Sequence, residues 1–389
     1  MSIEWKTYRL GELVKVKGGK RLPKGISLQI APNTHPYIRI RDMGKSRVLE
    51  LDATYEYVDD VTQKSIARYV VDEGDILLSI VGTIGLVGIV GKSLHQANQT
   101  ENCVKLVNLN GIDPLFLYYF LLSPKGQEEI KRGTVGAVQA KLPIKNIENI
   151  EISLPGLEEQ RRIAGILGAI DDKIEYNRRI NTNLELQAQA LFDEWCKSCS
   201  KTITIKELAD NILDYTPNEN SEVVLLNSSD VTQGVFTKLP LVSNMNLKGQ
   251  FKKRFRKGDI LYSEIRPRNK HYAYCYFDSD KYIASTRLIV LRGKKEKIVS
   301  NTLLYQYLIS QNVFEEFTLK TETRSGTFPQ GNYQDLSSIV VPYSDNQKEI
   351  AGVLDSIYKR IWHNNTEVDN LATLRDTLLP KLMNGEIKL

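Results

Sequence analysis

The stretch from Glu159 to Trp195 reads EQRRIAGILGAIDDKIEYNRRINTNLELQAQALFDEW, and its apolar residues recur at alternating spacings of three and four. This spacing places them along one stripe of an α-helix, as in a coiled-coil seam. A second stretch, from Asn346 to Leu382, reads NQKEIAGVLDSIYKRIWHNNTEVDNLATLRDTLLPKL and aligns with the first without a gap at an offset of 187 residues. The sequence therefore predicts two related long helices.

The internal repeat extends beyond these helices. At the same offset YYFLLS at 118–123 aligns with YQYLIS at 305–310, and with a small drift GDIL at 74–77 aligns with GDIL at 258–261. A repeat of this length predicts that each half of the chain is a globular head followed by a long helix. The expected boundaries are 1–155 for the first head, 156–199 for the first helical segment, 200–342 for the second head and 343–389 for the second helical segment.

Each head combines strands with short helices. Short β-branched runs bounded by Gly, Asn and Asp predict strands, and one helix is expected near 114–132, with a counterpart near 302–317. The predicted fold class is α+β. It consists of two tandem mixed α/β domains, related by an internal pseudo-two-fold repeat, and two long helices that form an antiparallel coiled coil.

The predicted seam follows a heptad frame in both helices. An alternative is that each helix packs only on its own head. However, a helix of about 36 residues is about 54 Å long, whereas a head of this size has a radius of gyration near 14 Å, so most of the seam needs a partner helix. The residues expected in the seam are Ile163, Leu167, Ile170, Ile174, Asn177, Leu184, Leu191, Ile350, Leu354, Ile357, Ile361, Asn364, Leu371 and Leu378.

Chain connectivity predicts the orientation of the two helices. The second head starts at the end of the first helix and ends at the start of the second, so a parallel pair would force that head to bridge the whole helix length. An antiparallel pair brings the two points together. Asn177 and Asn364 occupy equivalent seam positions, where a buried polar residue weakens packing but penalises a shifted register.

Composition excludes several classes of protein. The chain has 389 residues, of which 41% are hydrophobic and 25% charged, as in ordinary globular proteins. Four cysteines are too few for a disulfide-built secreted scaffold, and we expect a reducing cytoplasm. The N-terminus does not resemble a signal peptide, and no apolar run is long enough to span a membrane.

Catalytic motifs are incomplete throughout the chain. VGKS at 90–93 resembles the end of a phosphate-binding loop, but the required earlier glycine is replaced by Leu86. DPLF at 113–116 resembles an amino-methyltransferase signature but lacks its second proline, and Cys196 and Cys199 form a single CxxC without a second pair. We therefore expect no catalytic, cofactor-binding or metal-binding residue, with a stand-alone DNA methyltransferase or nuclease, or a pure coiled-coil scaffold, as alternatives.

Both heads contain local basic segments at corresponding places. The net charge is only +5, so a nucleic-acid footprint has to be local. Arginine pairs with guanine edges and lysine with phosphates, and two related heads suit a DNA site in two halves. The candidate DNA-binding residues are Lys20, Arg21, Lys24, Arg39, Arg41, Lys45, Arg47 and Thr83 in the first head, and Arg254, Arg256, Arg266, Arg268, Lys270 and Arg324 in the second.

Several short motifs together resemble one known family, the specificity (S) subunits of type I restriction-modification systems. The motifs are LGEL at 10–13, GDILLS at 74–79, GTIG at 82–85, LP at 154–155 and EQ at 159–160, then GDIL at 258–261, VP at 341–342 and LLPKLMNGEI at 378–387. The resemblance covers the whole chain. It departs from the family pattern in the second head, where EIRPRN at 264–269 replaces the GTIG segment and suggests a more basic loop.

The resemblance implies a non-catalytic subunit of a larger enzyme. Each head would be a target recognition domain that reads one half of an asymmetric bipartite DNA site, and the helical spacer would set the distance between the halves. The helical regions would dock two methyltransferase (M) subunits, which carry S-adenosylmethionine, and restriction (R) subunits, which use ATP and Mg. No cofactor is then expected on this chain, and no membrane.

Overall fold

The computed structural model describes residues 5–44, 46–136, 138–245, 247, 249–323, 329–387 and 389. The chain divides into two compact units. Unit 1 combines Met1–Asn177 with Glu367–Leu389, and unit 2 is Arg178–Thr366. Helix α6 (Leu157–Lys197) begins in unit 1 and ends in unit 2, whereas α11 (Lys348–Met383) begins in unit 2 and ends in unit 1. Each unit therefore holds half of each long helix.

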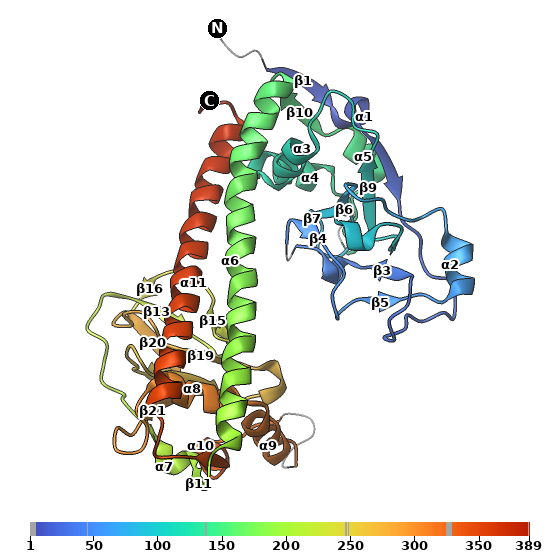
Figure 1. Ribbon diagram of the computed structural model, residues 1–389. Coiled ribbons are helices and arrows are strands. Elements are labelled where there is room, and N and C mark those ends of the chain that lie inside the picture. The colour runs from blue at the N-terminus through green and yellow to red at the C-terminus, as the bar shows by residue number, and fades with distance from the viewer. Residues whose placement is uncertain are drawn as a thin grey trace. The chain divides into compact units, whose positions relative to one another are not determined.

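In both units α6 and α11 lie side by side and run in opposite directions (Figure 1). In unit 1 Arg375 of α11 donates to Asp171 of α6 over 2.8 Å. In unit 2 Asn181 of α6 donates to Asn365 of α11 over 2.7 Å. The partner on α11 moves back along the chain as the residue on α6 moves forward, which confirms the predicted antiparallel pairing.

Most expected seam positions are buried, but the seam also belongs to the cores of the heads. The unit 1 core contains Ile163 and Leu167 of α6 together with Leu382 of α11. The unit 2 core takes its α11 residues from the first half of that helix and its α6 residues from the last turns. Each head therefore packs against both helices, not only against its own. Ile170, Leu184, Ile357, Leu371 and Leu378 are partly exposed.

Leu191 departs from the expected seam. Its side chain is 45% exposed, whereas Ala188 and Phe192 are buried in the core of unit 2. Near its C-terminal end α6 packs on the second head, where the Phe192 ring meets the Tyr307 ring edge-on at 4.9 Å. Near this end of α6 the buried position is therefore Phe192, one residue after the position that the heptad frame predicts.

Among its described residues, the head of unit 1 contains three sheets and five short α-helices. Strand β1 (Lys6–Arg9) pairs antiparallel with β10 (Glu151–Leu154). A five-stranded sheet has the order β2 (Lys15–Gly18), β9 (Cys103–Val107), β6 (Ile76–Ser79), β7 (Val87–Val90) and β4 (Val48–Leu49). A three-stranded sheet has the order β5 (Glu56–Tyr57), β3 (Pro36–Ile38) and β8 (Asn98–Gln99). The helices are α1 (Leu10–Leu13), α2 (Asp60–Ile66), α3 (Pro114–Leu122), α4 (Pro124–Gly133) and α5 (Ile144–Glu148).

The head of unit 2 repeats this plan with changes at the sheet edges. Strand β11 (Lys201–Thr204) pairs with β22 (Val340–Tyr343). One four-stranded sheet has the order β12 (Ala209–Asn211), β21 (Leu288–Gly293), β18 (Ile260–Ser263) and β19 (Tyr272–Tyr274). The other has the order β16 (Val242–Ser243), β13 (Glu222–Leu226), β20 (Tyr282–Ser285) and β17 (Phe251–Lys253), and β14 (Val231–Thr232) forms a hairpin with β15 (Val235–Phe236). The helices are α7 (Ile205–Leu208), α8 (Asn301–Ile309), α9 (Gln311–Glu322) and α10 (Tyr333–Ser337).

The single helix expected near 114–132 is two helices, α3 and α4, and the counterpart near 302–317 is likewise split into α8 and α9. Ser123 ends α3 and caps α4, because its hydroxyl accepts from the N–H of Gly126. A Cβ atom at Gly126 would lie 2.0 Å from the Phe120 carbonyl oxygen, so the sharp bend needs glycine. Apolar periodicity continues across the bend, which is why the pattern predicts one helix.

The turn after β18 contains left-handed residues but no glycine. In the first head Gly82 and Gly85 have φ angles of 76° and 92°. In the second head Arg266 and Lys270 have φ angles of 46° and 52°, a left-handed conformation that costs a residue with a Cβ about 1–2 kcal/mol. The segment at 264–270 therefore has strained basic residues at Arg266 and Lys270, where the turn of the first head has glycines in the left-handed conformation.

Buried asparagines interrupt the apolar seam in both units. In unit 2 Asn364 is fully buried and its amide donates to Asn181 Oδ1 over 2.7 Å, while Asn364 Oδ1 has no hydrogen-bond partner among the described residues. In unit 1 the Asn177 amide donates to Glu367 over 2.8 Å. Each amide is thus tied to the opposite helix, which penalises a shifted register.

The asparagine pair of unit 2 predicts a non-additive effect on stability. Asn364→Leu leaves Asn181 Oδ1 without its donor, and we expect this to lower the free energy of unfolding by about 1–3 kcal/mol. The double variant Asn181→Leu with Asn364→Leu removes both members of this pair and leaves only the partly exposed Asn365 without a donor, so it is expected to be more stable than Asn364→Leu alone. Thermal unfolding midpoints of the parent chain, the two single variants and the double variant measure this. Additive losses in the double variant would contradict the pairing.

Candidate nucleic-acid interface

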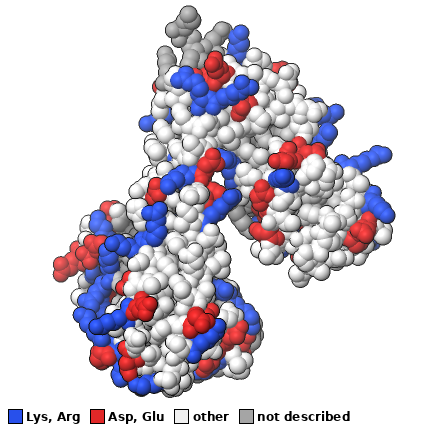
Figure 2. Space-filling view, viewed as in Figure 1, with Lys and Arg blue, Asp and Glu red and all other residues white. Residues whose placement is uncertain are grey.

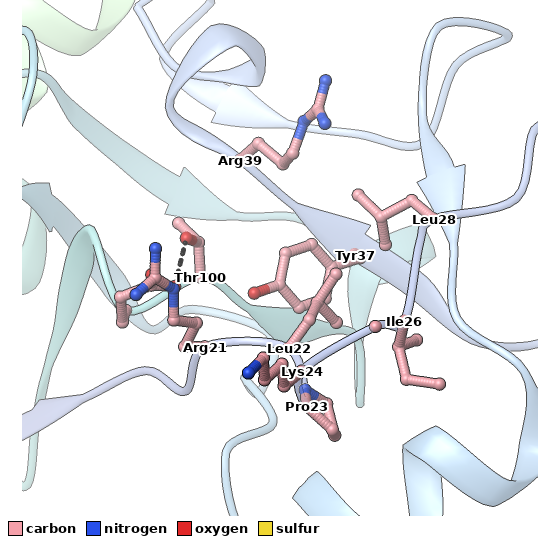
Figure 3. A pocket seen from close by; sticks show the side chains of 11 residues that line it. Arg21, Leu22, Pro23, Lys24, Ile26, Leu28, Tyr37, Arg39 and Thr100 are labelled. Carbon is pink, nitrogen blue, oxygen red and sulfur yellow. Dashed lines mark hydrogen bonds and ion pairs between the residues drawn. The ribbon is translucent and has the colours of Figure 1, made fainter.

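A pocket of about 660 Å³ opens in the head of unit 1 beside strands β3 and β8. One wall is the loop from Arg21 to Leu28, and the other side carries Tyr37, Arg39, Thr100 and Glu101. Figure 3 shows the Tyr37 ring between Arg39 and the segment that carries Arg21 and Lys24. The pocket thus combines an aromatic ring with three cationic side chains.

The local fold brings these residues together through a parallel strand pair. Tyr37 of β3 pairs with Asn98 of β8, so Arg39 and Thr100 follow the two strands at the same edge. The loop passes close to this edge at Gly19, where a Cβ atom would lie 2.0 Å from the Thr100 carbonyl oxygen. The Tyr37 hydroxyl donates to the Lys20 carbonyl over 2.9 Å, and burial raises the pKa of Tyr37 to about 12. Tyr37 is therefore a neutral, fixed wall of the pocket.

Carboxylates position the cations around this pocket. Arg21 lies 3.3 Å from Glu101, and Arg39 and Arg41 share Glu56 at 2.8 Å and 3.1 Å. Arg21 remains 85% exposed, so its contact with Glu101 orients the guanidinium without removing it from solvent. The rim can consequently accept an anionic or base-bearing ligand.

Unit 2 has a pocket of about 350 Å³ at the corresponding place. It lies between the loop after β12, which carries Tyr215 and Pro217, and a wall formed by β17 and by Ile283 of β20. Strand β20 pairs in parallel with β13, as β8 does with β3. Lys252 and Arg254 supply its cations. The Arg254 Nε is buried and has no hydrogen-bond partner among the described residues. The internal repeat therefore preserves a pocket with cationic walls in both heads.

Other sequence candidates lie away from the two pockets. Arg47 is held inside unit 1 by the Tyr119 hydroxyl, the Gly168 carbonyl and Asp172, and its side chain is only 18% exposed. Arg268 forms a two-pronged ion pair with Glu322 of α9. These two guanidinium groups have partners within the protein, which argues against Arg47 as a DNA contact.

The remaining candidates fall into three groups. Lys20 and Lys270 lie over the rings of Tyr69 and Phe314, at 5.7 Å and 5.1 Å from the ring centres. Thr83 and Arg256 are exposed, and Arg266 is in the left-handed turn. Lys45 and Arg324 lie outside the described residues. Of the predicted set, the structure therefore brings Arg21, Lys24 and Arg39 to the pocket of unit 1 and Arg254 to the pocket of unit 2.

The aromatic and hydroxyl walls of the pockets were not among the sequence candidates. Tyr37, Thr100, Tyr215 and Phe251 line the two pockets. Tyr37 and Thr100 are brought together by a parallel strand pair between segments about 60 residues apart in the chain, which no local pattern reveals. The one feature of the sequence that could have indicated this wall is the aromatic residue Tyr37, which lies two positions before the candidate Arg39.

Positively charged side chains form local groups and do not cover the whole of the face that Figure 2 shows. Figure 2 shows Lys and Arg interspersed with Asp and Glu, with Lys and Arg gathered along one side of unit 2. Among the residues that the structure describes, no group of three or more His, Cys, Asp or Glu side chains could hold a metal ion. Within that same part of the chain, no helix is long and apolar enough to cross a membrane.

Two repeated heads, each with a cation-lined pocket, and a pair of antiparallel helices define a DNA specificity protein of the restriction-modification class. Residues 2–186 and 200–371 match the family described as "Type I restriction modification DNA specificity domain". The chain belongs to this family, as the sequence motifs predicted.

Proteins similar to this chain are also type I specificity subunits. Over 174 residues, or 43% of this chain, it is 36% identical to the type I restriction enzyme HindI specificity subunit of Haemophilus influenzae, and the match spans 37% of that protein. Over 417 residues it is 21% identical to the MjaIX specificity subunit of Methanocaldococcus jannaschii, covering 99% of this chain and 94% of the relative. The type I S subunit from M. genitalium shares the fold, with a TM-score of 0.59, 18% identity and coverage of 98% and 96%.

The contacts of Arg47 predict that its removal destabilises the protein, whereas removal of an exposed cation such as Arg21 does not. Arg47→Ala leaves the Gly168 carbonyl and Asp172 without their donor, so we expect the free energy of unfolding to fall by about 1–3 kcal/mol. Arg21→Ala, at an exposed position, is expected to change it by less than about 0.5 kcal/mol. Thermal unfolding of the two variants measures this, and equal destabilisation would show that Arg47 has no special structural role.

Proposed function

We propose that this chain recognises DNA for a type I restriction-modification complex, and that each head reads one half of an asymmetric bipartite duplex site. The observation that carries the proposal is the pair of cation-lined pockets at corresponding positions of the two repeated heads. Their lining residues differ, with Tyr37 and Arg39 in one and Tyr215 and Arg254 in the other. Because the walls differ, the two half-sites differ in sequence.

The helical pair is proposed as the spacer between the half-sites. Both α6 and α11 are continuous through the division between the units, and α6 has 41 residues, a length of about 61 Å. This exceeds one turn of duplex DNA, which is about 34–36 Å. The buried asparagines tie the register of the pair, and a fixed register keeps the spacer length constant.

We further propose that catalysis resides on partner subunits in the cytoplasm. Two methyltransferase subunits with S-adenosylmethionine, and restriction subunits that use ATP and Mg, would dock on the helical regions and act at the bound site. The incomplete catalytic motifs of this chain support this division of labour. A methyl-transfer assay on the isolated chain tests it, because activity without a partner would favour a stand-alone methyltransferase.

Pocket variants should alter one half-site each. We expect Arg21→Ala with Lys24→Ala to change recognition of one half of a motif selected from a random duplex library, and Lys252→Ala with Arg254→Ala to change only the other half. Each lysine that contacts a phosphate contributes about one unit to the slope of log affinity against log salt, so that slope should fall as well. The measurement is selection followed by binding titrations at several salt concentrations.

The matched control is Lys131→Ala with Lys145→Ala, which removes two exposed charges of α4 and α5 outside the pocket. This control should leave both half-sites unchanged. Equal losses at both halves from either pocket pair would mean that these residues contact only the DNA backbone.

Lengthening the helical pair should lengthen the spacer of the recognised site. We expect one heptad inserted after Asn177 in α6 and another before Glu367 in α11, which face each other, to add about 10.5 Å. At 3.4 Å per base pair this corresponds to about three extra base pairs between the half-sites. Selection from the same library measures the spacer, and an unchanged spacer would exclude the helices as its determinant.

A further inference from the structure

Unit 2 contains a cavity of about 320 Å³ at the junction of its head with the two long helices. Its walls come from α6, from the turn between β14 and β15, from Tyr305 of α8, and from Tyr358 and Trp362 of α11. Glu185 of α6 lines the cavity as well. A space of this size fits a small molecule, and three aromatic rings surround it.

Two polar groups of this cavity lack partners. Tyr305 is only 4% exposed, and its hydroxyl makes no hydrogen bond with any described residue. Gly234 lies beside it, since a Cβ atom there would be 2.9 Å from the Tyr305 oxygen. The Glu185 carboxylate likewise has no hydrogen bond or ion pair with the described residues. A buried hydroxyl and a carboxylate therefore face the cavity without a protein donor.

Glu185, Tyr305 and Tyr358 line the same cavity, and the carboxylate acts on both tyrosine hydroxyls. Burial raises the pKa of Tyr305 and of Tyr358, and the negative charge of Glu185 raises both further. Burial also raises the pKa of Glu185 itself. Glu185 is an exposed residue, so this desolvation is partial and its carboxylate is open to a ligand from solvent. A cation held among these groups would pair with the carboxylate and contact the aromatic faces, which also attract cations.

The corresponding junction of unit 1 is filled by a cation of the protein. There Arg47, which precedes the strand beside β7, donates to the Tyr119 hydroxyl over 3.4 Å and to the Gly168 carbonyl over 3.1 Å. Tyr119 also donates to Asp171, which accepts from Arg375. Guanidinium groups, a carboxylate and a tyrosine hydroxyl thus form a closed network.

Unit 2 lacks both of these guanidinium groups. At the offset of the repeat, Gly234 stands where unit 1 has Arg47, and Ala188 stands where it has Arg375. The correspondence of Gly234 is also structural, because its N–H donates to Tyr272 of β19, the counterpart of β7. Gly234 lines the cavity, so the cavity borders the position from which Arg47 extends in unit 1. The counterparts of the Arg47 partners, Gln306, Asp355 and Lys359, do not line it.

We propose that this cavity binds a small organic cation of the guanidinium or primary ammonium type. Glu185 accepts hydrogen bonds from the cationic head, the Tyr305 hydroxyl accepts another, and the Tyr358 and Trp362 rings contact its apolar stem. Arg178 lies two turns before Glu185 on α6, about 10 Å along the helix, so the far end of the ligand is uncharged or anionic. The site lies apart from the proposed DNA-reading pockets.

The test uses the full chain without DNA, so its outcome does not depend on the proposed function. Isothermal titration compares n-butylguanidinium and n-butylammonium with n-butylurea, which has a similar shape but no charge. We expect the two cations to bind and the urea to bind at least about tenfold more weakly, as for hydrogen bonds between charged groups. Equal binding of all three, or no binding of the cations, would overturn the proposal.

Variants locate the binding to this cavity. Glu185→Gln keeps the shape of the side chain and removes its charge, and Tyr305→Phe keeps the ring and removes its hydroxyl. Both should weaken n-butylguanidinium binding, Glu185→Gln by about tenfold or more. Glu296→Gln, an exposed position of unit 2 outside the cavity, is the matched control and should leave binding unchanged. Loss of binding in the control to the same extent as in Glu185→Gln would contradict the site.

The cation could be a free metabolite or an arginine or lysine side chain of a partner subunit. Repeating the titration on the complex with the methyltransferase subunits distinguishes these sources. Unchanged affinity for n-butylguanidinium in the complex assigns the site to a free cation. Loss of the added cation's binding on complex formation assigns it to a side chain of the partner.

Discussion

The structure depends on the packing of α6 against α11. In unit 1 the start of α6 packs with the end of α11, and in unit 2 the pairing is reversed, so each head is built on the same two helices. Neither core is complete without residues from both long helices: Ile163 and Leu382 enter the core of unit 1, and Ala188 and Ile350 enter that of unit 2. Buried asparagines replace apolar residues at a few seam positions. They reduce the apolar area buried between the helices, but they also make a shifted register costly because an unpaired amide would then be buried.

The two heads show how a repeat can keep its framework and change its surface. The strand pairs β1 with β10 and β11 with β22 are equivalent, and so are the parallel pairs β3 with β8 and β13 with β20. The changes are concentrated in loops and junctions. After β18 the left-handed residues are Arg266 and Lys270, whereas after β6 they are Gly82 and Gly85, and Gly234 stands where the first head has Arg47. Such strain is typical of sites whose side chains have a function beyond folding.

Much of the fold could be predicted from the sequence, because heptad spacing and an internal repeat are long-range patterns with a direct structural meaning. The two long helices, their antiparallel pairing and the family were all predicted from such patterns. The bend at Ser123 was not, since it depends on one capping hydroxyl and on the close approach of Gly126 to a carbonyl. The exposure of Leu191 was missed because packing on the head overrides the heptad frame. Charge alone could not separate Arg47, which bonds to its own unit, from Arg21, which is exposed, and it could not reveal the Tyr37 wall.

The central claim is that this chain selects the DNA sequence on which a methyltransferase partner acts. A genome-wide map of methylated adenine in the source organism, by long-read sequencing with the gene intact and deleted, tests it most directly. The account predicts that deletion abolishes methylation of one asymmetric motif made of two short sequences separated by a fixed spacer. If no motif loses its methylation although the methyltransferase partner is expressed and active, the chain does not specify the target and the account is contradicted.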